Sequence, residues 1–176
     1  MDFIIGIVFI SALGTLFHFT YDLSKHNKIV ALFSAVNEST WEHIKMALTP
    51  TFLWSLYDIF VYFPNPNYFS AKLISLLVII IVIPLIFYGH KLIFKKSILI
   101  INIATFYIAV ILSQLSMNWI LSLDSFGYMI NSVSVILIMC LFGLYLIATL
   151  IPINNFLFTD PITKKIGIRG HGDFHQ

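Results

Sequence analysis

Residues 69–88 read FSAKLISLLVIIIVIPLIFY, and this stretch decides the class of the protein. Its twenty residues include a single charged side chain, that of Lys72. An α-helix rises about 1.5 Å per residue, so a hydrocarbon core of about 30 Å is crossed by roughly 20 apolar residues. The stretch therefore predicts a helix that spans a membrane.

Further stretches of similar length and composition lie on both sides of it. They cover residues 3–20, 41–63, 98–121 and 128–151. Hydrocarbon offers no partner to backbone N–H and C=O groups, so a spanning segment must bond internally as a helix or close into a barrel. Barrel strands would alternate apolar and polar residues over about ten positions, and these runs do not. The sequence predicts an all-α, multi-pass transmembrane bundle of about five spans.

The composition of the whole chain agrees with this class. Hydrophobic residues make up 59% of the 176 residues and charged residues 10%, with a mean hydropathy of +0.94. A soluble domain would carry about 25% charged residues. The net charge of +2 provides no basic surface for nucleic acid. We expect one integral membrane domain over residues 1–176, its first span an uncleaved anchor because Asp2 stands where a signal peptide would be basic.

Basic residues are distributed very unevenly between the two sides of the expected bundle. Nine fall in the connections after the first and third spans and after the fifth, namely Lys25, Lys28, Lys45, Lys91, Lys95, Lys96, Lys164, Lys165 and Arg169. The other side carries Lys72 alone. Cytoplasmic loops are enriched in Lys and Arg, so the N-terminus is predicted outside the cell membrane and the tail 152–176 in the cytoplasm.

The connection between the first two spans has its own character. Residues 29–36 are apolar but too few to cross a bilayer, which favours a short interfacial segment. Residues 39–42, Ser-Thr-Trp-Glu, then match the capping box that begins many helices. In that motif the Ser39 hydroxyl accepts from the backbone of Glu42, and the Glu42 carboxylate returns to the backbone N–H of Ser39.

Three stretches carry a resemblance to a known family. They are LFHFTYD at residues 16–22, ALFSAVNESTWEHIK at 31–45, and FTDPIT at 158–163 followed by Gly167-Ile168. Together they resemble an uncharacterised family of small bacterial multi-pass integral membrane proteins with an N-E-S-T-W-E-H motif. At residues 87–90 the chain has Phe-Tyr-Gly-His, where relatives tend to carry an aromatic-rich Phe-Tyr-Thr-Tyr run. The resemblance implies a membrane fold and no particular activity.

The best candidates for chemistry are His18, Glu42 and His43, as acid–base groups or metal ligands. Supporting polar residues are Asp22, Glu38, Ser39 and Asp58. An ionisable side chain within a span should face the bundle interior and have a partner. We therefore expect His18 to meet a polar group from residues 38–43, Glu42 foremost. Imidazole and carboxylate are common ligands of Zn²⁺ and Mn²⁺, but no H-E-x-x-H motif is present, so metal and cofactor stay open.

Three functions are compatible with this pattern. The first is a structural or accessory protein of the bacterial cytoplasmic membrane. The second is a small enzyme that acts on a lipid or other membrane-embedded substrate at the cytoplasmic face. The third is a transporter or transporter subunit, with Asp58, Gln114 and His18 marking the path. The expected partners are membrane lipids and a second copy of the chain or another membrane protein, and no nucleic acid.

Overall fold

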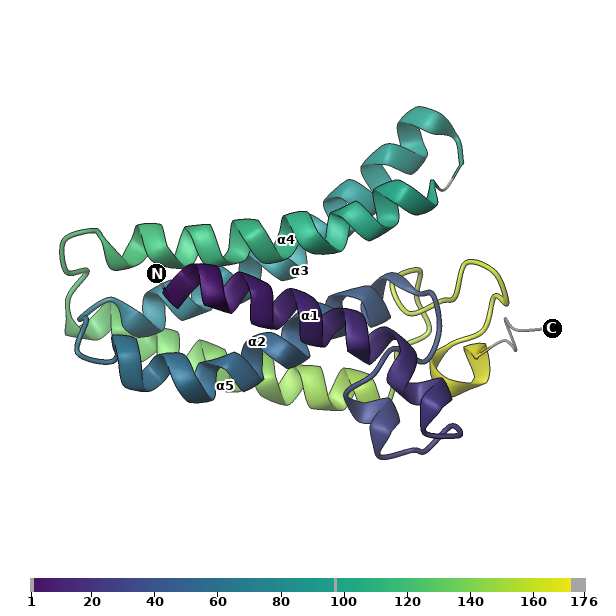
Figure 1. The fold of residues 1–176 in the computed structure, drawn as a ribbon, viewed down its shortest axis with the longest axis horizontal. Helices are drawn as coiled ribbons and strands as arrows, with labels where there is room; N and C mark the ends of the chain where they lie inside the picture. Colours follow the sequence, from purple (N-terminus) through teal and green to yellow (C-terminus); the bar gives the residue numbers. More distant parts are fainter. Residues whose placement is uncertain (1, 97, 172–176) are drawn as a thin grey trace.

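The chain forms a bundle of five α-helices in a computed structural model that describes residues 2–96 and 98–171 (Figure 1). The helices are α1 (Asp2–Leu23), α2 (Thr40–Tyr62), α3 (Tyr68–Phe94), α4 (Leu99–Leu121) and α5 (Tyr128–Leu150). Two 3₁₀ turns accompany them, η1 (Val30–Leu32) and η2 (Gly167–Gly170). No strand occurs among the described residues. The predicted all-α bundle is confirmed.

Four of the helices, α1, α3, α4 and α5, are long and apolar enough to cross a membrane. The exception is α2, which carries Glu42, Lys45 and Asp58. This helix packs against α1, α3 and α4, and all three of these side chains are buried. Because these three charged side chains are buried against protein, the helix that carries them need not be apolar throughout.

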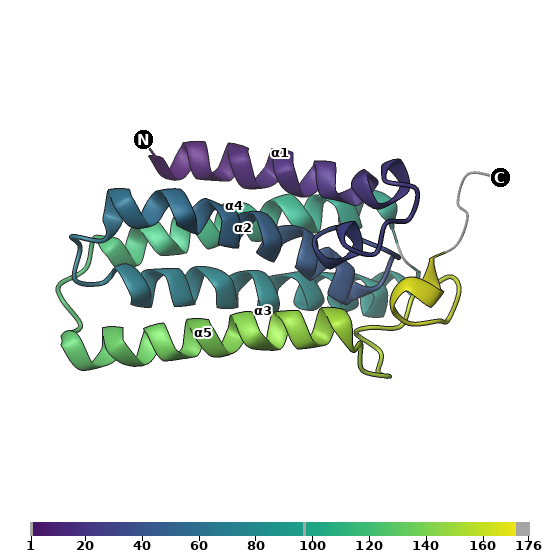
Figure 2. The same ribbon diagram turned by 90° about the horizontal axis from the view of Figure 1, so that it is seen from below.

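The five helices pack side by side. α3 and α4 lie along each other, α5 flanks α3, and α1 lies on the opposite side, against α2 and α4 (Figure 2). The main core is aliphatic where these helices meet, with fully buried side chains at Ile10, Ala47, Leu76, Ile79 and Ala109. These contacts hold the last turns of α1 beside the first turns of α2.

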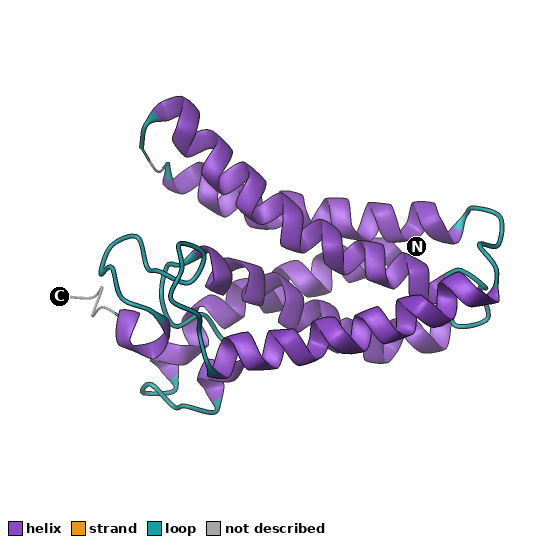
Figure 3. Ribbon diagram, turned by 180° about the vertical axis from the view of Figure 1, so that it is seen from behind, coloured by secondary structure: helices purple, strands orange, loops and turns teal. Residues whose placement is uncertain are grey.

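The two ends of the bundle differ (Figure 3). At one end, here called the turn end, short connections 63–67 and 122–127 join α2 to α3 and α4 to α5. The Asn67 side chain ties these connections together, since it donates to the carbonyls of Leu123 and Asp124 at 3.0 Å each and accepts from the N–H of Phe126 at 2.9 Å. The opposite end, here called the tail end, carries the loop 24–39, the α3–α4 connection and residues 151–171.

At the tail end α3 runs past the predicted limit of residue 88 and ends at Phe94. Residues 87–90 continue the helix, and Lys95 stops it in the left-handed conformation at φ 57°. At this end α3 and α4 diverge together from the other helices (Figure 1).

Candidate functional site

Ser39 begins α2, as the sequence predicted. Its backbone is extended (φ −71°, ψ 156°), and its hydroxyl accepts from the N–H of Glu42 at 3.4 Å. The reciprocal half of the capping box is wrong, however. The N–H of Ser39 donates to the side-chain oxygen of Asn37 at 2.8 Å, a local turn that leaves nothing for the Glu42 carboxylate to accept.

Glu42 is instead directed into the protein. Its Oε2 accepts from the N–H of Val36 at 3.1 Å and pairs with Lys45 Nζ at 2.6 Å. Lys45 also donates to the carbonyl of Ala31 at 2.9 Å. Glu42 and Lys45 are 4% and 1% exposed, so this pair attaches the loop 31–36 to α2 from the inside.

His18 and His43 do converge, but they meet at Glu38. His18 Nε2 lies 3.9 Å from Glu38 Oε1, and His43 Nε2 lies 3.7 Å from Glu38 Oε2. The expectation that His18 faces residues 38–43 is confirmed, while Glu42 as its partner is wrong. The side chains of His18 and Glu38 are about one-third exposed, at 35% and 34%, and that of His43 is 16% exposed. This cluster is therefore reachable from outside the bundle.

The protonation of His43 follows from its neighbours. Its Nδ1 lies 2.9 Å from the carbonyl oxygen of Ser39, which can only accept, so Nδ1 carries the hydrogen. In neutral imidazole Nε2 then has a lone pair, and that lone pair faces the Glu38 carboxylate. Two imidazoles beside one carboxylate are a set of residues used in acid–base chemistry.

The C-terminal segment packs against the residues that lead into α2 and is hydrogen-bonded to them. The N–H of Glu38 donates to Asp160 Oδ2 at 2.8 Å, and the N–H of Trp41 donates to the carbonyl of Leu157 at 2.9 Å. The Asn37 side chain donates to the carbonyl of Gly167 at 2.8 Å. We call residues 34–42 together with residues 155–171 the latch, since the first part donates these three hydrogen bonds to the second.

Asp160 is the centre of the latch. It is fully buried, and its other oxygen, Oδ1, accepts from the N–H groups of Ile162 and Thr163 at 2.7 Å each. Its own N–H donates to the carbonyl of Lys165 at 2.9 Å. One carboxylate therefore shapes the tail segment and holds Glu38 in place.

Asp58 does not join the other predicted site residues. It lies in the last turns of α2, toward the turn end, whereas His18 lies in the last turns of the antiparallel α1. Asp58 is fully buried, bonded to Lys72 Nζ and to the hydroxyl of Tyr68, which donates to Asp58 Oδ1 at 2.6 Å. This contact joins α2 to α3.

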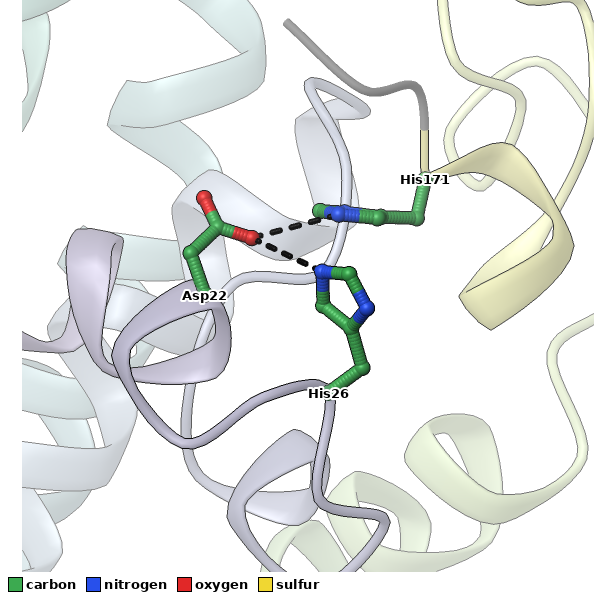
Figure 4. Close-up of side chains that lie close together, drawn as sticks. All are labelled: Asp22, His26 and His171. Carbon is green, nitrogen blue, oxygen red and sulfur yellow. Dashed lines mark ion pairs between the residues drawn. The ribbon is translucent and has the colours of Figure 1, made fainter. Parts of the chain in front are cut away.

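A second group of histidines surrounds Asp22 (Figure 4). Asp22 Oδ1 lies 3.4 Å from His26 Nε2 and 3.2 Å from His171 Nε2. Asp22 is among the supporting residues predicted from the sequence, whereas neither histidine is. The spacing of four between Asp22 and His26 was an available signal. His171 gave none, since the tail fold alone brings it to Asp22.

The comparisons with known proteins give a family and no activity. The model of a family of unknown function, DUF6512, matches residues 2–168, a range that includes the five helices and nearly all of the latch. No curated protein and no solved structure matches the chain.

Proposed function

The chain belongs to this family of unknown function, and we propose that it is a non-enzymatic accessory protein of the cell membrane. In this proposal the helices are surrounded by lipid, and the latch presents a fixed polar surface to the cytoplasm. The further partner is a second copy of the chain or another membrane protein.

The contacts of the buried charged residues carry the proposal. Glu42, a leading candidate for chemistry in the sequence, is held by the N–H of Val36 and by Lys45. Asp58 is held by Lys72 and Tyr68. Each of these buried carboxylates is paired with a buried lysine and accepts a further hydrogen bond from within the protein. Such contacts stabilise one arrangement of the chain and leave the carboxylate unavailable to a substrate.

The buried lysines also bear on orientation. Lys45 and Lys72 are both paired inside the bundle, so neither is a loop charge. Without Lys45, eight of the nine basic residues remain at the tail end, seven on its connections and Lys91 in the last turn of α3. Without Lys72, the other side has none. The loop 24–39, the α3–α4 hairpin and the tail lie at one end of the bundle (Figure 1). This asymmetry supports a cytoplasmic tail end and an external N-terminus.

The cluster of His18, Glu38 and His43 favours a second candidate function, a small enzyme at the cytoplasmic face. Two imidazoles face the two oxygens of one carboxylate, and the group is partly exposed. In that case Glu38 takes the role that the sequence gave to Glu42, and His43 Nε2 is the proton-transferring atom. The substrate would be a lipid or another membrane-embedded molecule.

Complementation of a deletion strain distinguishes the two functions. Membrane proteins and lipids are quantified by mass spectrometry in cells that lack the gene and in cells that express single variants. An accessory role predicts lowered levels of other membrane proteins, restored by His43→Gln but not by Asp160→Ala, which opens the latch. Accumulation of a lipid that native protein clears and folded His43→Gln does not would contradict the accessory role and support the enzyme.

A further inference from the structure

We propose that Asp22, His26 and His171 bind a divalent transition-metal ion, with Zn²⁺ as the preferred class. The site goes beyond the proposed function, because the hydrogen bonds of the latch form without it. Its ligands come from three parts of the chain: the last turn of α1, the loop that follows, and the residue after η2 (Figure 4).

Two of the three distances between the ligand atoms are close to those around a tetrahedral ion. Zn²⁺ binds imidazole nitrogen and carboxylate oxygen at about 2.0–2.2 Å, so neighbouring ligands in a tetrahedron lie about 3.3–3.6 Å apart. The two nitrogens lie 3.4 Å and 3.2 Å from Asp22 Oδ1, and one ligand atom from each residue fits within 4.8 Å of the others. A direct ion pair between protonated imidazole and carboxylate would be shorter, about 2.7–2.9 Å.

The second nitrogen of His171 points to the same conclusion. Its Nδ1 lies 3.0 Å from the carbonyl oxygen of Val36, so this nitrogen carries the hydrogen. In this tautomer of neutral imidazole, Nε2 has the lone pair, and Nε2 faces Asp22. Histidine ligands of metals are oriented in this way, by a hydrogen bond from the nitrogen that does not bind the ion.

Packing holds both rings in place. The buried Tyr21 ring contacts the imidazoles of His26 and His171 with centroids 5.2 Å and 5.0 Å apart. His26 is fixed by its left-handed backbone, φ 64°, and its N–H donates to the carbonyl of Tyr21 at 3.0 Å. The site is thus formed before an ion arrives.

The open side of the site leaves room for water as a fourth ligand. The side chains of Asp22 and His26 are 43% and 49% exposed. Three protein ligands with one solvent position is a common coordination for Zn²⁺. Two imidazoles select such an ion over Mg²⁺ and Ca²⁺, which take oxygen ligands. The bound ion would join the end of α1 directly to the tail.

The test uses the full-length protein, purified in detergent and stripped of metal with a chelator. Co²⁺ is titrated first, because its visible absorption reports the coordination number, and Zn²⁺ is then added as competitor. We expect about one equivalent of four-coordinate Co²⁺, full displacement by Zn²⁺ and a higher melting temperature with Zn²⁺. Absence of saturable binding at this stoichiometry would overturn the proposal.

Two variants locate the ion. His26→Asn suits the left-handed backbone, which Asn tolerates, and His171→Phe keeps a ring against Tyr21. Each should weaken Co²⁺ affinity at least about tenfold, a loss that even residues behind the ligands can cause. The matched control is His43→Gln in the other histidine cluster, which should bind as native. The assignment would be refuted if His43→Gln weakened Co²⁺ affinity as much as the two ligand variants do. It would also be refuted if a protein with both His26→Asn and His171→Phe bound Co²⁺ with native affinity.

Circular dichroism and size-exclusion profiles establish whether each variant is folded. If His26→Asn or His171→Phe does not fold, Asp22→Asn tests the third ligand instead. A protein that binds no metal would leave the complementation results unchanged, so this inference and the proposed function fail separately.

Discussion

Glu42 illustrates how one buried carboxylate fixes a loop. Its charge is balanced by Lys45, and one oxygen also accepts the N–H of Val36. Removing one partner of a buried ion pair leaves the other charge without compensation, and such losses typically cost about 3–5 kcal/mol.

We therefore expect Glu42→Gln to lower the free energy of unfolding by about 3–5 kcal/mol, because Lys45 stays buried. Unfolding in a graded denaturant–detergent mixture measures this. Glu38→Gln is the matched control, since Glu38 is one-third exposed and its loss should cost less than about 1 kcal/mol. Equal stability of the two variants would show that the Glu42–Lys45 pair does not hold the loop.

For Gln114, in contrast to Glu42, we expect that replacement does not destabilise the protein. Gln114 is buried in α4, and its Nε2 has no hydrogen-bond partner among the described residues. An unsatisfied buried donor carries a desolvation cost of about 1–3 kcal/mol. Gln114→Met keeps the volume and removes the donor, so we expect equal or higher thermal stability in detergent. The control is Ser113→Ala, which loses a bond to Ser75 at 2.6 Å and should be less stable.

A clear drop in stability for Gln114→Met would mean that this amide makes a stabilising contact within the protein. The contacts of Asp58 already resemble helix packing, because they join α2 to α3 through Lys72 and Tyr68.

At the scale of elements, the docking of α1 depends on a close approach at Gly14. A Cβ at this position would lie 2.6 Å from the carbonyl oxygen of Met46 and 2.5 Å from the Phe106 ring. The backbone of α2 cannot yield as a side chain can, so α1 would have to shift.

Gly14→Ala should therefore destabilise the bundle, although alanine favours helix by about 0.5–1 kcal/mol over glycine. The matched control is Gly143→Ala in α5, where a Cβ meets nothing within 4 Å and should be stabilising. Melting temperatures of the two variants in one detergent measure the difference. A stabilised Gly14→Ala would show that α1 packs more loosely than described.

The helices were predictable from the sequence because a long apolar run without alternation can satisfy its backbone hydrogen bonds in a bilayer only as a helix. The site was predictable only in part. Helix geometry brought His18 and His43 near each other, but it could not choose between Glu38 and Glu42. That choice depends on Asp160, which binds the N–H of Glu38 from 122 residues later in the chain. Such long-range loop contacts have no periodic signal.

For the molecule as a whole, the two ends differ in chemistry. The turn end is held by amide side chains such as that of Asn67, and its connections carry no basic residue. The tail end carries the latch, both histidine clusters and eight basic residues, nine less the buried Lys45. This asymmetry underlies the proposed orientation, in which the tail end faces the cytoplasm.

Cysteine labelling tests this orientation most directly. Cys140, which is exposed on α5, is first replaced by serine, and one new cysteine is introduced at Asp124 or at Ile162. Both positions are exposed, Asp124 at the turn end and Ile162 in the tail. A membrane-impermeant maleimide should label Asp124→Cys in intact cells and Ile162→Cys only after the membrane is opened. Labelling of Ile162→Cys in intact cells, with Asp124→Cys protected, would contradict the account and place the latch outside.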